Sequence, residues 1–286
     1  MVDIVQKNLI LIFLLLIIFI VLFSFLTFII SIKPGKWPFE FTPESFNLEY
    51  ENVTFETSDG LKLKGWFLPS NKNNNTIIVM HGYPTNKADV LPFSMFLLKK
   101  FNVFLFDFRS FGESQGTYTT TGYKEVKDLD AAVEYLKSRE DVKNIGALGF
   151  SLGASVAIMN KNNDIKAIVA DSAYSNLNNM IEAMYRHFLF FKYPFVQLTG
   201  VYSKIFFGLD TKDINPANDI KNINHVLIIH GEKDSQIPIN EAYILHNANK
   251  KTELWIVENA DHGEIYALNK EEYEKRVLEF FEKHLR

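Results

Sequence analysis

Short apolar runs alternate with amphipathic stretches along most of the chain after residue 45. Runs of about four to eight apolar residues bounded by turn residues are typical of buried strands, and an apolar face that recurs every three or four residues is typical of a helix. The predicted strands are 48–57, 61–68, 76–80, 103–106, 145–150, 165–170, 226–229 and 254–257. The predicted helices are 87–100, 123–137, 152–159, 240–248 and 271–284. This alternation indicates an α/β fold, with a mostly parallel sheet of about eight strands covered by helices on both faces.

The N-terminal segment has a different pattern, because residues 9–32 include no charged side chain and consist mainly of Leu, Ile, Phe and Val. About 20 apolar residues span the hydrocarbon core of a bilayer, so this run predicts a transmembrane helix. A secretory signal peptide is the alternative, but its apolar region is usually about 7–15 residues long and ends at a small-x-small cleavage site, which this sequence does not offer convincingly. We therefore expect a single-pass membrane protein with an N-terminal anchor (residues 1–32) and a short stalk (residues 33–45). The few lysines that flank the run leave the side of the membrane undecided.

A second departure is the segment of residues 173–215, which is rich in aromatic residues and methionine. It is too long for an ordinary connection and too apolar for a solvated loop. Long ordered insertions often carry binding surface, so we predict a helical lid of one to three helices over the functional site. The alternative is that these aromatic side chains only pack on the edge of the sheet. Residues 46–286 are then one domain with the lid as an insertion.

Composition narrows the range of partners. The 286 residues include 30 Lys and Arg and 34 Asp and Glu, with the two signs interspersed and a net charge of −4, so nothing favours nucleic acid. There is no cysteine, which excludes disulfides, thiolate metal sites and a cysteine nucleophile. No motif indicates a metal or a cofactor, and we expect neither.

Ser151 stands where the predicted strand 145–150 meets the predicted helix 152–159 without a loop between them. It is the central residue of a G-x-S-x-G sequence, residues 149–153. A strand that turns straight into a helix forces the residue at the junction into a strained conformation, and the flanking glycines leave room for neighbouring chain. The serine oxygen is then pushed outward. This context predicts that Ser151 is a nucleophile.

A serine hydroxyl needs a base within hydrogen-bond reach, and the base needs a group that orients it. His262 follows the last predicted strand, in a loop at the carboxyl end of the sheet, where the catalytic groups of open parallel sheets gather. Asp234 stands in the corresponding loop after strand 226–229 and is the predicted orienting acid. Two alternatives stay open at this point. Asp171, after strand 165–170, is a rival acid, and Asp234 could instead cap the helix that follows it.

Attack on a carbonyl creates an oxyanion, which needs preorganised N–H donors. Leu152, at the start of the helix after the serine, supplies one backbone N–H. The loop after strand 76–80 reads His81-Gly82-Tyr83-Pro84. Because proline has no N–H, Tyr83 is the predicted second donor of the oxyanion hole.

In these residues and motifs the chain resembles the α/β-hydrolase superfamily. Within it, the chain is similar to single-pass membrane-anchored serine hydrolases of the serine-aminopeptidase-like and lysophospholipase-like group. The resemblance covers residues 46–286 and implies a catalytic triad of Ser151, Asp234 and His262, in the chain order expected of this fold. The group's Asp-x-Arg-Gly loop is Asp107-Phe-Arg109-Ser110 here, with the glycine replaced. We expect Asp107 and Arg109 to be a buried pair that braces the loops.

The sequence thus predicts a membrane-anchored serine hydrolase, similar to esterases, thioesterases and lipases, that cleaves a carboxylic ester or thioester of a small-molecule or lipid-like acyl substrate through an acyl-enzyme. A serine peptidase or amidase is the alternative, although the lid offers no evident cluster of acids or arginines to hold a peptide terminus. A non-catalytic binding protein of the same fold is the third hypothesis, and such proteins usually lack a triad residue. The head group, the acyl length and the oligomeric state stay open.

Overall fold

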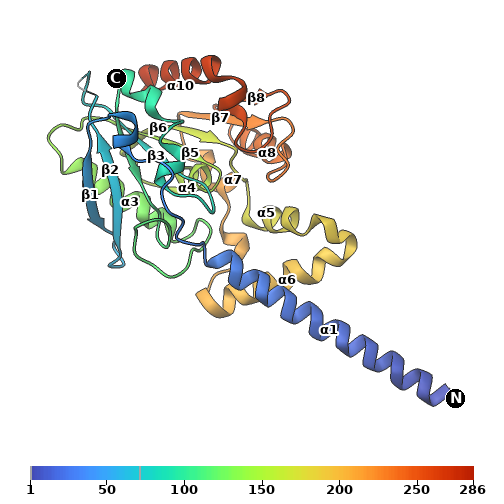
Figure 1. Cartoon of the computed structure of the whole chain (residues 1–286). Helices are drawn as coiled ribbons and strands as arrows, with labels where there is room; N and C mark the ends of the chain where they lie inside the picture. Colours follow the sequence, from blue (N-terminus) through green and yellow to red (C-terminus); the bar gives the residue numbers. More distant parts are fainter. Residues whose placement is uncertain (1, 71) are drawn as a thin grey trace.

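The structure is a computed structural model that describes residues 2–70 and 72–286 (Figure 1). Within these residues an eight-stranded sheet has the order β1-β2-β4-β3-β5-β6-β7-β8. β1 (Glu51–Glu56) and β4 (Asn102–Phe106) both pair antiparallel with β2 (Lys62–Leu68). All the other neighbours pair in parallel, through β3 (Thr76–Met80), β5 (Ile145–Phe150), β6 (Ile165–Asp171), β7 (Val226–Gly231) and β8 (Glu253–Val257). The predicted α/β fold with a mostly parallel sheet is confirmed.

Helices cover both faces of the sheet, which is why its central strands are continuously apolar. β3, β4 and β7 are buried at every residue, whereas the outermost strands β1 and β8 have exposed or half-buried positions. One face packs against α3 (Glu125–Lys137), α4 (Leu152–Met159) and α8 (Asn240–Ala248). The opposite face packs against α2 (Lys87–Val90), α9 (Ile265–Leu268) and α10 (Lys270–His284).

The prediction of one helix over residues 87–100 is wrong. The chain forms the short helix α2, then a turn, and then a 3₁₀ helix, η2 (Met95–Lys99). Pro92 lies in the turn. Proline has no N–H to donate to the carbonyl oxygen of Ala88, and its ring clashes with the preceding turn, so the helix does not continue past Leu91.

Between β6 and β7 the chain leaves the sheet and forms the lid, residues 173–215. Its main helices are α5 (Leu177–Met184) and α6 (Lys192–Phe207), joined by η3 (Arg186–Phe191), and α7 (Pro216–Asp219) leads back to the sheet. The prediction of a small helical lid is confirmed.

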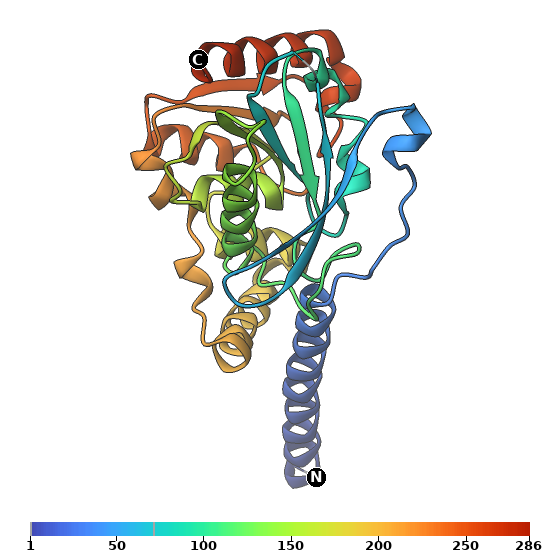
Figure 2. The ribbon, with the colours of Figure 1, turned by 90° about the vertical axis from the view of Figure 1, so that its left-hand side faces the viewer.

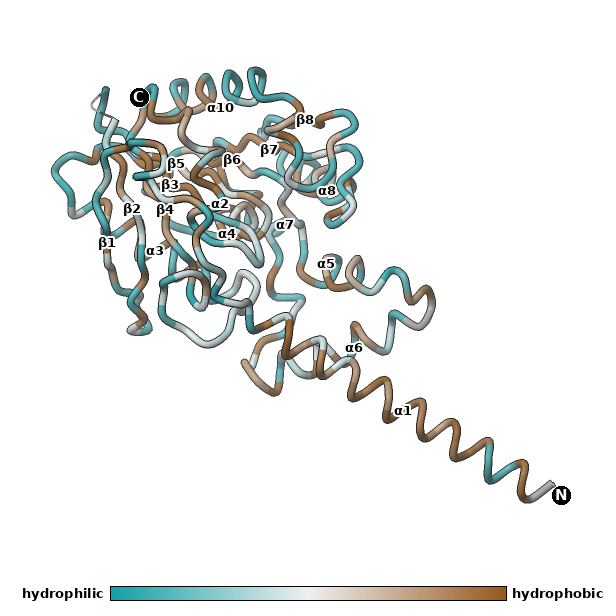
Figure 3. Tube along the Cα trace, viewed as in Figure 1, coloured by the Kyte–Doolittle hydropathy of each residue, from teal (hydrophilic) through white to brown (hydrophobic). Residues whose placement is uncertain are grey.

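The N-terminal helix α1 (Val2–Ile32) projects away from the domain beside the lid (Figures 1 and 2). It is apolar along almost all its length (Figure 3), and from Ile4 to Ile32 it is long and apolar enough to cross a membrane, with a mean hydropathy of 3.5 over an 18-residue window. Ile4 to Phe19 are exposed at every position, whereas Ser24, Phe28 and Ile32 are buried against the domain. The helix therefore has a free part and a docked part.

Candidate active site

Ser151 has φ 54° and ψ −111°, a backbone conformation that residues other than glycine rarely adopt. It joins the last residue of β5 to the first residue of α4. A Cβ atom at Gly149 would lie 2.3 Å from the carbonyl carbon of Gly153, and a Cβ atom at Gly153 would lie 2.6 Å from the carbonyl oxygen of Met80. The helix starts in backbone contact with the strands, so both positions need glycine. These two glycines allow the sharp turn that presents the Ser151 hydroxyl.

A chain of two hydrogen bonds links the three predicted triad residues. His262 Nε2 lies 3.2 Å from Ser151 Oγ, and His262 Nδ1 lies 2.8 Å from Asp234 Oδ2. A carboxylate only accepts hydrogen bonds, so Nδ1 carries a hydrogen and donates a hydrogen bond to Asp234. In a neutral imidazole Nε2 is then an acceptor, and it faces the hydroxyl whose proton a general base would take. The three side chains come from the loops after β5, β7 and β8, at one edge of the sheet.

Asp234 is fixed on both sides of its buried carboxylate. Its Oδ1 accepts hydrogen bonds from the backbone N–H groups of Gln236 and Ile237, at 2.9 and 2.7 Å. Its Oδ2 contacts His262 and also lies 3.6 Å from Nε2 of His230, which donates a hydrogen bond to the carbonyl oxygen of Ile237. One oxygen therefore orders the loop, while the other remains available to orient the histidine. Asp234 does not cap α8, the alternative considered from sequence, because the residue at that cap is Ile239.

The rival acid, Asp171, lies in the same region and has other partners. Its carboxylate accepts hydrogen bonds from Ser172 Oγ at 2.9 Å and from Tyr273 OH at 3.0 Å. Burial raises the pKa of Asp171 to about 6, although these two hydrogen bonds and the nearby His262 act in the opposite direction. The structure thus places Asp234, and not Asp171, in hydrogen-bond contact with the imidazole.

The loop after β3 approaches Ser151 closely. A Cβ atom at Gly82 would lie 3.1 Å from the Cβ of Ser151, so only glycine fits without displacement. Next to it, the fully buried His81 donates from Nδ1 to the carbonyl oxygen of Gly82 at 2.7 Å and accepts at Nε2 from the N–H of Phe108 at 3.1 Å. These two partners fix the neutral form of the ring, and burial lowers its pKa in the same sense. His81 therefore holds this loop against the loop after β4.

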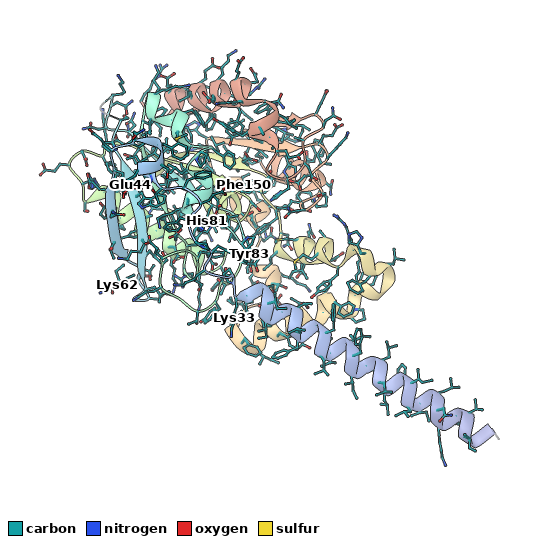
Figure 4. All side chains as sticks on the ribbon, viewed as in Figure 1. Lys33, Glu44, Lys62, His81, Tyr83 and Phe150 are labelled. Atoms are coloured by element: carbon teal, nitrogen blue, oxygen red, sulfur yellow. The ribbon has the colours of Figure 1, made fainter. Side chains whose placement is uncertain are left out.

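Tyr83 and Leu152, the two predicted donors of the oxyanion hole, line a cavity of about 240 Å³ together with Ser151. Figure 4 labels Tyr83 between the strand end that carries Phe150 and the end of α1 near Lys33. Gln236, from the loop that follows Asp234, lines the same cavity. The sequence analysis did not single out this residue, because a glutamine in a loop carries no pattern that distinguishes a lining residue from a solvated one.

The predicted pairing of Asp107 with Arg109 is wrong in its partners. Arg109 donates hydrogen bonds to Asp128 in α3 and to Asp59 in the β1–β2 turn, at 2.6 and 2.9 Å. Asp107 instead accepts a hydrogen bond from the buried Nζ of Lys87 at 2.6 Å. Both residues lie in the irregular loop after β4, where residues two apart need not face one another. Both pairs brace loops that lead to the site, which is the role expected of them. Among the described residues, no group of three or more His, Asp or Glu side chains could hold a metal ion.

The eight-stranded sheet, the strained serine between β5 and α4 and the loops at the carboxyl edge define an α/β hydrolase. The sequence model of the prolyl oligopeptidase family (Peptidase_S9) matches residues 109–286. The chain belongs to the prolyl oligopeptidase family, and it is a hydrolase.

Among solved structures, the chain is similar to the esterase Pf2001 of Pyrococcus furiosus. The two are 32% identical, with a TM-score of 0.73, over 90% of this chain and 99% of the esterase. An acylaminoacyl peptidase of Pyrococcus horikoshii shares the fold, with a TM-score of 0.63 and 19% identity, over 83% of this chain and 42% of the peptidase. Curated relatives include the uncharacterized protein YqkD of Bacillus subtilis, 27% identical over 84% of this chain and 82% of YqkD. They also include the α/β-hydrolase domain-containing protein WAV2 of Arabidopsis thaliana, 27% identical over 89% of this chain and 86% of WAV2.

Proposed function

We propose that the protein is a membrane-anchored serine hydrolase that cleaves a carboxylic ester or thioester with an acyl chain. The observation that carries this proposal is the hydrogen-bond chain from Ser151 through His262 to Asp234, at a serine in strained backbone geometry. A nucleophile, a base in contact with it and an acid in contact with the base are the parts that acyl transfer needs.

In the proposed reaction, Ser151 Oγ attacks the carbonyl carbon while its proton moves to His262 Nε2. Asp234 stays ionised and stabilises the imidazolium that forms. The backbone N–H groups of Tyr83 and Leu152 hold the tetrahedral oxyanion. His262 then gives the proton to the leaving oxygen or sulfur as its bond to carbon breaks, and an acyl-Ser151 remains. Water, deprotonated by the same histidine, releases the carboxylic acid and the free serine.

An ester substrate with an apolar acyl group is supported by three observations. The esterase Pf2001 is similar over nearly its whole length. The cavity at Ser151 adjoins a second, mostly apolar cavity, with which it shares five lining residues. The helix α1 is suited to hold the domain at a bilayer, which is where acyl lipids are found.

A fluorophosphonate probe, which reacts with activated serines, tests the mechanism. We expect full labelling of the wild-type protein and none of Ser151→Ala, and a loss of at least about 10³-fold in labelling rate for His262→Ala. Ser155→Ala is the matched control, because Ser155 lies one turn further along α4 and contacts the carbonyl oxygen of Tyr174 instead of a histidine. Undiminished labelling of Ser151→Ala would refute the assignment.

A peptidase is the second candidate, favoured by the match to the prolyl oligopeptidase family. The two are separated by the kcat/KM values of the same preparation on an acyl ester and on an aminoacyl anilide. We expect the ester value to be higher. A higher value on the anilide would transfer the proposal to peptide or amide substrates.

Membrane anchoring through α1 has a test of its own. After alkaline carbonate treatment of membranes, an integral protein stays in the pellet. Release of the full-length chain into the supernatant, or a mature protein that begins after α1, would favour the signal-peptide alternative.

A further inference from the structure

The docked part of α1 is held to the lid by aromatic and hydroxyl contacts. The rings of Phe23 and Phe195 have centroids 5.7 Å apart, and those of Phe28 and Tyr202 have centroids 5.6 Å apart. The hydroxyls of Ser24 and Tyr202 lie 3.1 Å apart in a buried position. Aromatic pairs at this spacing stabilise beyond their buried area. The end of the anchor is therefore a packed part of the domain and more than a tether.

An apolar cavity of about 290 Å³ lies where α1 meets the lid. Its lining comes from three helices, α1, α5 and α6, and includes Phe28, Ser31, Ile32, Ile181, Met184 and Phe207. Most of the side chains that line it are aliphatic or aromatic. Such a cavity suits an aliphatic ligand, because few polar groups in it would lose water without a replacement partner.

This cavity adjoins the one that contains Ser151. Five residues line both cavities, namely Tyr83, Thr121, Met180, Met184 and Gln236. An acyl group whose carbonyl carbon lies at the serine oxygen would pass these residues on its way toward α1. Tyr83 stands at the junction on one side, and its hydroxyl reaches the carbonyl oxygen of Ile30 in α1 at 3.5 Å.

We propose that this cavity binds the acyl chain of the substrate, so that the last turns of the membrane anchor form one wall of the substrate site. The proposal rests on the function proposed above. A methylene group is similar in size to a water molecule, whose share of liquid volume is about 30 Å³, so the cavity has room for a chain of roughly ten methylene groups.

The position of the cavity along α1 indicates how a lipid would reach it. A helix rises about 1.5 Å per residue, so a hydrocarbon core of about 30 Å takes about 20 residues. The uncharged apolar run begins at Leu9, and the contacts with the domain begin near Ile20, so the first turns of the docked part lie at the bilayer. The lid carries exposed apolar side chains there, among them Leu189 and Ile205, which are both 72% exposed. A substrate dissolved in the bilayer would therefore enter beside α1 without crossing water.

Filling the cavity from either wall tests the proposal in the full-length chain, reconstituted in lipid nanodiscs. Ser31→Phe fills it from α1, and Ser203→Phe fills it from α6. The matched controls are Ile30→Phe and Val201→Phe, which add the same ring at outward positions that are 60% and 49% exposed. The measurement is kcat/KM on a butyryl and on a decanoyl ester of the same alcohol, with the midpoint of thermal unfolding recorded for every variant.

We expect the kcat/KM of each filled variant to fall about 60-fold on the decanoyl ester and to stay within about twofold of wild type on the butyryl ester, with both controls close to wild type on both esters. The figure follows from about three excluded methylene groups, each worth a factor of about four. Ile181→Ala, which enlarges the cavity, should shift the preferred ester to a longer acyl chain, and it provides the reverse test if a filled variant does not fold.

Three results would overturn the proposal. Equal losses on both esters in a folded variant would mean that the added ring disturbs the reaction itself. Unchanged decanoyl turnover would mean that the chain lies elsewhere. A loss in Ser203→Phe alone would place the chain in the lid and remove α1 from the site. Fluorophosphonate labelling separates these outcomes from a failure of the proposed function. If the protein is labelled and hydrolyses the butyryl ester, but the filled variants show no dependence on acyl length, the hydrolase function stands and only the acyl-chain site is refuted.

Discussion

Asp234 and Asp171 are two carboxylates close to the same histidine, His262, and their asparagine variants test which of them orients it. Asp234→Asn replaces the carboxylate oxygen that lies 2.8 Å from His262 Nδ1. The amide can turn its NH2 group toward Nδ1, which favours the tautomer with the proton on Nε2. In that tautomer Nε2 cannot accept the proton of Ser151. We expect kcat to fall by about 10⁴-fold. Asp171→Asn leaves this contact in place, and kcat should stay within about threefold of wild type.

The same Asp171→Asn substitution should stabilise the protein at neutral pH. Burial raises the pKa of Asp171 from 3.8 to about 6. At about 1.36 kcal/mol per pKa unit, the ionised carboxylate costs the folded state about 3 kcal/mol at pH values well above 6. Because the folded protein binds the proton more tightly than the unfolded chain, this cost is absent below about pH 4, grows as the pH rises to about 6 and is constant above. An asparagine carries no charge and removes up to that amount.

Urea unfolding of the full-length chain in detergent micelles, at about pH 4 and about pH 7.5, measures the stability change, and butyryl ester turnover measures kcat. The expected result is a gain in unfolding free energy at the higher pH that disappears at the lower one, with activity retained. A gain of the same size at both pH values would show that charge burial is not its cause. A loss of kcat as large as that of Asp234→Asn would refute the choice of orienting acid.

Two further predictions concern the scaffold. Gly153→Ala should abolish ester hydrolysis and lower the unfolding midpoint, because the added Cβ would lie 2.6 Å from a backbone oxygen of β3. The control is Gly200→Ala in α6, where the nearest atom is 3.8 Å away and the substitution should stabilise the protein by up to about 1 kcal/mol. Equal effects of the two substitutions would contradict the close-approach argument. Arg109→Ala leaves a buried carboxylate of α3 without its partner and should cost about 3–5 kcal/mol in urea unfolding. Lys283→Ala removes an exposed ion pair and should leave the midpoint unchanged, so a similar loss in both would contradict this account.

The bounds of helices and strands are predicted most accurately from sequence where a short apolar run is bounded by turn residues. β3, β5, α4 and α8 begin and end at the predicted residues. In these segments local preference and tertiary packing agree, since a continuously apolar strand is what a covered parallel sheet requires. Asp234 and His262, which the structure brings into line with Ser151, were also found from sequence, because each follows a strand that ends at the same edge of the sheet.

The wrong predictions have separate physical causes. The prediction of a single helix over residues 87–100 ignored Pro92, whose missing N–H and bulky ring interrupt the helix despite the apolar periodicity around it. Asp107 pairs with Lys87, and Arg109 pairs with Asp59 and Asp128. These three partners come from three other elements, and proximity in sequence does not predict such contacts.

The contribution of α1 to the second cavity was not foreseen either. α1 is apolar on every side, so its sequence carries no periodicity that distinguishes the face that packs on the lid from the faces that do not. Only the packing of Phe28 and Ile32 against α6 and its surroundings reveals which side is buried.

The central claim is that an acyl group passes through the oxygen of Ser151. Turnover of the decanoyl ester by the full-length protein, stopped with acid and followed by proteolysis and mass spectrometry, tests it most directly. The account predicts a decanoyl mass increase on Ser151, in the peptide that spans the β5–α4 junction, and neither acylation nor turnover in Ser151→Ala. Undiminished ester hydrolysis by Ser151→Ala, or wild-type turnover with the acyl group on another residue, would contradict it.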